Sequence, residues 1–199
     1  MKLFQIEDIA VPVPKSYRDT IELAQSDYYR IHGKKTSLIK MWIYTLHEPS
    51  YAFLFWHRLS SYKCKSPIYY FCNFCKWMHR HYMFKYGILI PSSTKIGYGF
   101  SIGHPLSIVI NHTAIIGNNV NLSHNVTIGS NYEKAAVIGD NTYIGPNVSI
   151  IENVKIGKNV TIGAGAVIVK DVPDNATVVG NQQRITSFEE SGRFVHNRW

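Results

Sequence analysis

Carboxylates are scarce in this sequence, and none occurs between Glu48 and Glu133. The formal net charge is +8, and most of it comes from residues 1–90, which hold 13 Lys/Arg against 6 Asp/Glu. A basic segment of this kind favours an anionic partner, such as a membrane surface or an anionic acceptor. No nucleic-acid recognition motif accompanies the charge, so we expect no nucleic acid.

The sequence also lacks a secretory leader, because its first residues turn acidic at Glu7 and form no apolar core. We therefore expect a cytoplasmic protein whose three cysteines, Cys64, Cys72 and Cys75, are reduced thiols. Cys72 and Cys75 are spaced too compactly with the nearby histidines for known zinc modules, so no metal is expected. There is no uncharged apolar run of about 18 residues, which excludes a membrane-spanning helix.

Residues 1–87 are predicted to form an α-helical N-terminal domain. Residues 1–14 end in Val-Pro-Val-Pro, which opposes helix formation and indicates an irregular lead. Helices are expected from Ser16 to about Tyr29, over 36–47, over 51–62 and over 66–86, with Gly87 as the stop. The segment 51–86 is rich in aromatic and basic residues; we expect its helices to pack, or alternatively to contact a membrane peripherally.

Six-residue repeats then occupy the chain from Ile90 to Ile168, each opening on an aliphatic residue that Gly or Asn commonly follows. The step breaks twice, with 8 residues from Ile102 to Ile110 and 10 from Ile128 to Ile138. Self-similarity at a short fixed period is typical of a solenoid, and hexapeptides of a parallel β-helix. We therefore predict a mainly β protein, with a β-helix domain over 88–185 and a C-terminal tail over 186–199.

Three histidines, His104, His112 and His124, lie at predicted corners of this solenoid, where the fold itself does not require histidine. Imidazole titrates near neutral pH and can accept a proton from an alcohol that attacks an acyl group. No Gly-x-Ser-x-Gly elbow or other covalent-nucleophile signature occurs, so direct transfer is favoured over a covalent intermediate. A loop at 129–137 leaves the solenoid and is the candidate acceptor-binding element, through Asn131, Tyr132 and Glu133.

The segments Ile102-Gly-His-Pro to Ile128-Gly and Ile162-Gly-Ala-Gly to Gly180-Asn resemble the serine acetyltransferase-like branch of the hexapeptide O-acetyltransferases. Many members of that branch modify saccharides of capsules, O-antigens and exopolysaccharides. The resemblance implies a left-handed parallel β-helix with three hexapeptides per coil. It also implies acetyl-CoA as donor, a homotrimer with active sites between subunits, and His104 as the general base.

With three hexapeptides per coil, His104, His124, Pro146 and Ala164 fall on one edge of the solenoid once the insertions are added. In similar sugar acetyltransferases, a groove along such an edge holds acetyl-CoA. The positions implied here for the donor are Pro146, Ala164, Val169, Lys170 and Arg184. Lys170 and Arg184 would then meet its phosphates.

Three positions depart from serine acetyltransferases, which have Asp where Gly103 and Leu89 stand and His where Ala135 stands. These departures favour a saccharide hydroxyl over free serine as the acceptor. Serine O-acetylation stays the first alternative. Amino-sugar N-acetylation is another, because Asn111-His-Thr-Ala is similar to the stretch that carries the base in those enzymes, although Thr113 replaces their Glu. A silent solenoid scaffold is the non-enzymatic alternative.

Overall fold

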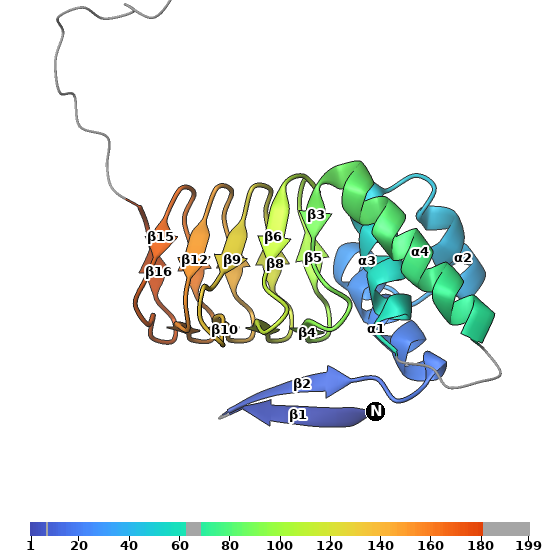
Figure 1. The fold of residues 1–199 in the computed structure, drawn as a ribbon, viewed down its shortest axis with the longest axis horizontal. Helices are drawn as coiled ribbons and strands as arrows, with labels where there is room; N and C mark the ends of the chain where they lie inside the picture. The colour runs from blue at the N-terminus through green and yellow to red at the C-terminus, as the bar shows by residue number, and fades with distance from the viewer. Residues whose placement is uncertain (7, 63–68, 181–199) are drawn as a thin grey trace, which may run out of the picture.

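The computed structural model describes residues 1–6, 8–62 and 69–180. An N-terminal β-hairpin and four helices precede a long stack of short parallel strands (Figure 1). The helices gather at one end of the stack, and the hairpin runs alongside it. The architecture confirms the predicted fold class, an α-helical region followed by a parallel β-solenoid.

The four helices lie close to their predicted places. They are α1 (Tyr17–His32), α2 (Leu38–Tyr44), α3 (Pro49–Ser60) and α4 (Tyr69–Tyr86). The predicted N-cap of α1 is confirmed, because the backbone N–H of Asp19 donates to Oγ of Ser16 at 3.2 Å. Gly33 ends α1 and Gly87 follows α4, both with positive φ.

The solenoid has three parallel sheets, which we call faces I, II and III. Face I contains β3 (Ile88–Leu89), β6 (Ile108–Ile110), β9 (Thr127–Gly129), β12 (Ser149–Ile151) and β15 (Val167–Ile168). Face II contains β4 (Lys95–Ile96), β7 (Ile115–Ile116), β10 (Val137–Ile138) and β13 (Lys155–Ile156). Face III contains β5 (Ser101–Ile102), β8 (Asn121–Leu122), β11 (Tyr143–Ile144), β14 (Thr161–Ile162) and β16 (Thr177–Val178).

The first residue of each hexapeptide points into the solenoid and stacks on its counterpart in the next coil. On face II, Ile96 pairs with Ile116, Ile116 with Ile138 and Ile138 with Ile156. All four side chains are buried. The apolar residue of each repeat therefore builds one continuous core, and the register between coils is fixed by that core.

The N-terminal lead is a hairpin, so the predicted irregular structure is wrong. Strand β1 (Lys2–Ile6) pairs antiparallel with β2 (Ile9–Val13). Ile9 and Val11 pack on Ile115 of face II, which removes apolar surface of both elements from water. Farther down the solenoid, Nζ of Lys158 lies 2.8 Å from a carboxylate oxygen of Asp8. The prolines are accommodated because the hairpin has free edges.

A buried ion pair joins the helices to the first coil. Arg58 of α3 makes two hydrogen bonds, of 2.8 and 2.9 Å, to the carboxylate of Asp27 in α1. The same guanidinium donates to the backbone carbonyls of Ile96 and Gly97, while the Phe100 N–H donates to Asp27. Both side chains are almost fully buried. The pair therefore fixes the helices on the coil from which strand β5 starts.

Two histidines, His57 of α3 and His79 of α4, are buried beside each other under Phe53, with ring centroids 5.1 Å apart. Burial lowers the pKa of His79 to about 4 and holds the pKa of His57 well below its ordinary value. Both rings are therefore neutral in the folded protein at pH 7.

Acidification should unfold the protein through these two rings. Because the folded pKa values lie below the unfolded value of about 6.5, their contribution to stability is complete above that pH and is lost as the pH falls towards 4. His79 alone should lower the free energy of unfolding by about 2 kcal/mol between pH 7 and pH 5. Thermal unfolding followed by circular dichroism across this pH range measures the change.

The His79→Phe variant should show a flatter pH dependence of stability, whereas His47→Phe, at an exposed site, should not. Equal slopes in the wild type and both variants would contradict the assignment of this pH dependence to His79.

The cysteines differ from the expected reduced set. Cys72 is disulfide-bonded, whereas Cys75 is a free, buried thiol whose pKa is raised to about 11 by burial. Cys64 lies outside the described residues. Within the described part of the chain, no group of three metal-ligating side chains occurs, and no helix is long and apolar enough to cross a membrane.

Candidate active site

His104 lies in a widened turn between β5 on face III and β6 on face I. Register places Ile102 beside Leu122 and Val109 beside Thr127, so this turn has two more residues than the one below it. The Asn125 N–H donates to the Leu106 carbonyl, which puts Leu106, and not His104, directly over His124 in the backbone stack. The extra residues bulge outward and carry the His104 side chain to the rim of the solenoid.

The His104 backbone is in the left-handed region, with φ of 57°. A non-glycine residue there is disfavoured by on the order of 1 kcal/mol, and most of the other non-glycine residues with positive φ are asparagines of the solenoid. The Gly103 N–H donates to the Leu122 carbonyl at 2.7 Å, which holds the start of the bulge against the next coil. The conformation of His104 is therefore imposed by its neighbours.

The rings of His104 and His124 meet edge to face, with centroids 5.8 Å apart and planes at 83°. His104 is exposed, and among the described residues none is seen to hydrogen-bond to its ring. His124 is half-buried, and its Nδ1 is buried without a hydrogen-bond partner from the described residues. The arrangement presents one accessible imidazole supported by a second, which suits proton transfer to or from a bound molecule.

Pro146 and Ala164 continue the same edge below His124. The Asn147 N–H donates to the His124 carbonyl, and the Gly165 N–H donates to the Pro146 carbonyl. Pro146 is half-buried and Ala164 is exposed. The structure thus brings together the four residues that the repeat arithmetic places on one edge, with small side chains below the two histidines.

Of the other positions implied for the donor, Val169 and Lys170 follow β15 and are exposed. They lie at the corner between faces I and II, one corner away from Ala164. Arg184 lies outside the described residues.

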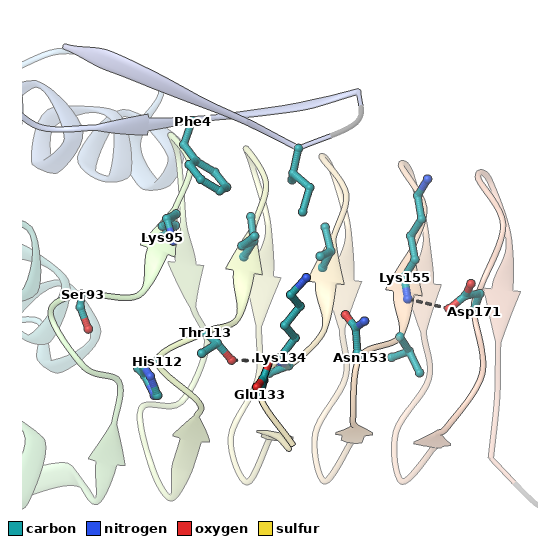
Figure 2. A pocket seen from close by; sticks show the side chains of 15 residues that line it. Phe4, Ser93, Lys95, His112, Thr113, Glu133, Lys134, Asn153, Lys155 and Asp171 are labelled. Carbon is teal, nitrogen blue, oxygen red and sulfur yellow. Dashed lines mark hydrogen bonds between the residues drawn. The ribbon is translucent and has the colours of Figure 1, made fainter. Parts of the chain in front are cut away.

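His112 is at the corner between faces I and II, following β6, and is separated from His104 by that strand. It lines a cavity of about 710 Å³ together with Thr113, Lys95 and residues of the hairpin. In Figure 2 the hairpin passes over this cavity, and its Phe4 points towards Lys95. The Lys95 ammonium lies 4.5 Å from the centre of the Phe4 ring. The sequence does not predict the contact between Phe4 and Lys95, because its proline-containing residues 1–14 indicate an irregular segment.

The loop at 129–137 extends from this same corner. Glu152 holds its start, accepting hydrogen bonds from Oγ of Ser130 at 2.6 Å and from the Asn131 N–H at 3.3 Å. The Ser130 hydroxyl lowers the pKa of the Glu152 carboxyl. The end of the loop is held by the Ala135 N–H, which donates to Oγ1 of Thr113. Between these anchors, Asn131, Tyr132 and Glu133 are exposed.

Within one chain, the loop therefore lies with His112 and not with His104. Glu133 lines the cavity beside His112, as Figure 2 shows. Glu133 is accordingly no partner of His104 in its own chain, whereas the His124 ring meets the His104 ring.

Residues 135–170 match the model of a protein family described as bacterial transferase hexapeptide (six repeats). The solenoid of this chain has hexapeptide repeats of the kind that this family model describes. The chain is also similar to solved serine acetyltransferases. Isoform 3 from Entamoeba histolytica, in complex with cysteine, is 26% identical with a TM-score of 0.67, over 86% of this chain and 62% of that one.

The Neisseria gonorrhoeae enzyme in complex with serine is 28% identical with a TM-score of 0.67, over 82% of this chain and 68% of that one. The soybean apoenzyme is 26% identical with a TM-score of 0.65, over 84% and 69% of the two chains. The chain thus spans about 62% of the length of the Entamoeba enzyme. No curated protein matches it.

Proposed function

We propose that the protein transfers an acetyl group from acetyl-CoA to a hydroxyl group, with His104 as the general base. The observation that supports this most directly is the exposed His104 ring, held against His124 at the head of an edge of small residues. The similarity to three serine acetyltransferases supports the same reaction type.

In the proposed reaction, a ring nitrogen of His104 takes the proton of the acceptor hydroxyl as its oxygen attacks the thioester carbonyl. A C–O bond forms, the C–S bond breaks, and the proton passes from the imidazolium to the departing thiolate of CoA. His104 can do this because its exposed ring leaves a nitrogen accessible to the acceptor. His124 or a backbone amide would stabilise the negative charge that develops on the carbonyl oxygen.

The donor would lie along the edge below His124, past Pro146 and Ala164, whose small side chains leave room for a thin pantetheine arm. Val169 and Lys170 lie one corner away from Ala164, so in a homotrimer those of a neighbouring copy, together with Arg184, would contact the far end of the donor, with the two cations near its phosphates. A homotrimer would complete the site: the His104 edge is open in one chain, and Asn131, Tyr132 and Glu133 project from a different corner. A neighbouring copy could bring its loop to that edge.

For the acceptor, we favour a saccharide hydroxyl. Holding the ammonium group of serine would need a carboxylate. Gly103, Leu89 and Ala135, the three positions that depart from serine acetyltransferases, carry no charged side chain. Ala135 is buried, so its side chain is not available to an acceptor. Serine is the second candidate, because all three solved enzymes named above are serine acetyltransferases.

Thiol release from acetyl-CoA, measured with serine, a nucleotide-linked amino sugar and a panel of oligosaccharides, tests the proposal. We expect turnover that depends on an oligosaccharide. Turnover with serine alone would refute a saccharide as the acceptor but would still support acetyl transfer to a hydroxyl group. Turnover with the amino sugar alone would favour His112 over His104 as the base. Failure with every acceptor, together with no binding of CoA in calorimetry, would indicate a scaffold.

A further inference from the structure

Helix α4 has a buried inner face and an exposed outer face that carries aromatic side chains. Cys72, Cys75 and His79 are buried on the inner face. On the outer face, Phe74, Trp77 and Phe84 follow one another at steps of 3 and 7 residues, which places them along one side of a helix. Trp77 is 61% exposed and Phe84 66%. We call these three residues the aromatic stripe.

The charged side chains of α4 are all cationic. Lys76, Arg80 and Lys85 are all exposed, and the Arg80 guanidinium lies 5.4 Å from the centre of the Phe84 ring. Because no carboxylate occurs between Glu48 and Glu133, no acidic side chain of this helix or of α3 neutralises them. The outer face of α4 therefore carries aromatic side chains along its middle, with the His81 ring stacked on Trp77 among them, and cations at its sides.

An apolar groove extends this surface from α4 to α2. It has a volume of about 370 Å³ and is lined by Phe71 and Phe74 of α4, Ile39 and Trp42 of α2, and Trp56 of α3, among other apolar and aromatic residues. Ile39 is 71% exposed. The exposed apolar surface thus spans two helices at the end of the molecule away from the lower coils (Figure 1).

We propose that this surface binds an anionic membrane, with α4 lying in the plane of the interface. Aromatic side chains favour the boundary between acyl chains and headgroups, and Lys and Arg beside them extend to anionic headgroups. The arrangement fits a surface helix, because no described helix can span a bilayer. The proposal extends beyond the acetyl transfer and does not depend on it.

A second copy of the chain fits the same surface poorly. A two-fold contact through the aromatic stripe would bring Lys76, Arg80 and Lys85 of both copies together. With no carboxylate on α4 or α3 to pair with these cations, that contact would be repulsive at its rim. Anionic lipid supplies the opposite charge, so the charge distribution favours the membrane.

Cosedimentation of the full chain with lipid vesicles tests the proposal. The protein should bind vesicles that contain phosphatidylglycerol and should bind pure phosphatidylcholine vesicles much more weakly.

Trp77→Gln combined with Phe84→Gln should weaken binding at least about tenfold, because two exposed aromatic side chains would no longer enter the interface. Lys76→Gln combined with Arg80→Gln should weaken it about fivefold for each charge removed. Tyr143→Gln, at an exposed aromatic site on the solenoid, is the matched control and should bind as the wild type does.

Circular dichroism and thermal unfolding of each variant would establish that these exposed substitutions leave the fold intact. Equal vesicle binding by the wild type and both double variants would overturn the proposal. So would the absence of vesicle binding together with a concentration-dependent mass, in sedimentation, that the Trp77→Gln/Phe84→Gln variant loses. That second result would show that the aromatic stripe is an interface between copies of the chain.

Discussion

Replacing His104 with alanine should lower acceptor-dependent thiol release from acetyl-CoA by about 100-fold or more, which is the usual contribution of a general base. The side chain is exposed, and its ring meets the His124 ring. Removing it should therefore leave the fold and the affinity for CoA unchanged. Steady-state kinetics for the reaction and calorimetry for CoA binding separate the two effects.

Two further variants make this test specific. His47→Ala removes an exposed histidine of the helical region and should retain full activity. His112→Ala removes the histidine at the other corner, which the amino-sugar alternative assigns as base. A loss of 100-fold in His112→Ala, with His104→Ala near the wild type, would overturn the assignment of His104 and favour the cavity under the hairpin as the reaction site.

The solenoid could be predicted from the sequence because each hexapeptide encodes its own register. An aliphatic residue every six positions has to point inward, and its counterparts then stack from coil to coil, as Ile96, Ile116, Ile138 and Ile156 do. The counts of inserted residues are equally local. They correctly place the bulge after Ile102 and the loop after Ile128.

What the counts could not give is the conformation within the bulge. Repeat arithmetic places His104 directly over His124, whereas the backbone stacks Leu106 there and His104 meets His124 through its ring. The hairpin was missed for a different reason. The Val-Pro-Val-Pro segment opposes a helix, but prolines are allowed at free strand edges, and the face that β2 packs on is far away in sequence.

The site is harder to predict than the fold because it depends on corners rather than on repeats. His104, His112 and the loop residues Asn131 to Glu133 are close in sequence, yet the triangular coil assigns them to two corners. Nearness in sequence therefore does not bring these residues together within one chain. Their meeting in one site would require a second chain.

Replacing Arg58 with alanine should reduce the free energy of unfolding by about 3–5 kcal/mol, the usual effect of leaving a buried charge without its partner. Asp27 is fully buried and would keep only the Phe100 N–H and its neighbours in α1 to stabilise its carboxylate. The carbonyls of Ile96 and Gly97 would lose their donors as well. Urea denaturation followed by circular dichroism measures the change. Arg80→Ala, at an exposed site on α4, should shift stability by no more than about 0.5 kcal/mol.

The double variant Asp27→Ala/Arg58→Ala identifies the cause. If the loss comes from the uncompensated charge, removing both partners should destabilise the protein by clearly less than the sum of the two single changes. Strictly additive losses would mean that each side chain acts through packing alone. Because Arg58 and Asp27 hold the backbone at Ile96, Gly97 and Phe100, just before strand β5, the same variants should also displace the turn that carries His104. Acetyl transfer should therefore fall in the Arg58→Ala protein even at temperatures where it remains folded, and unchanged activity there would show that the first coil keeps its shape without the ion pair.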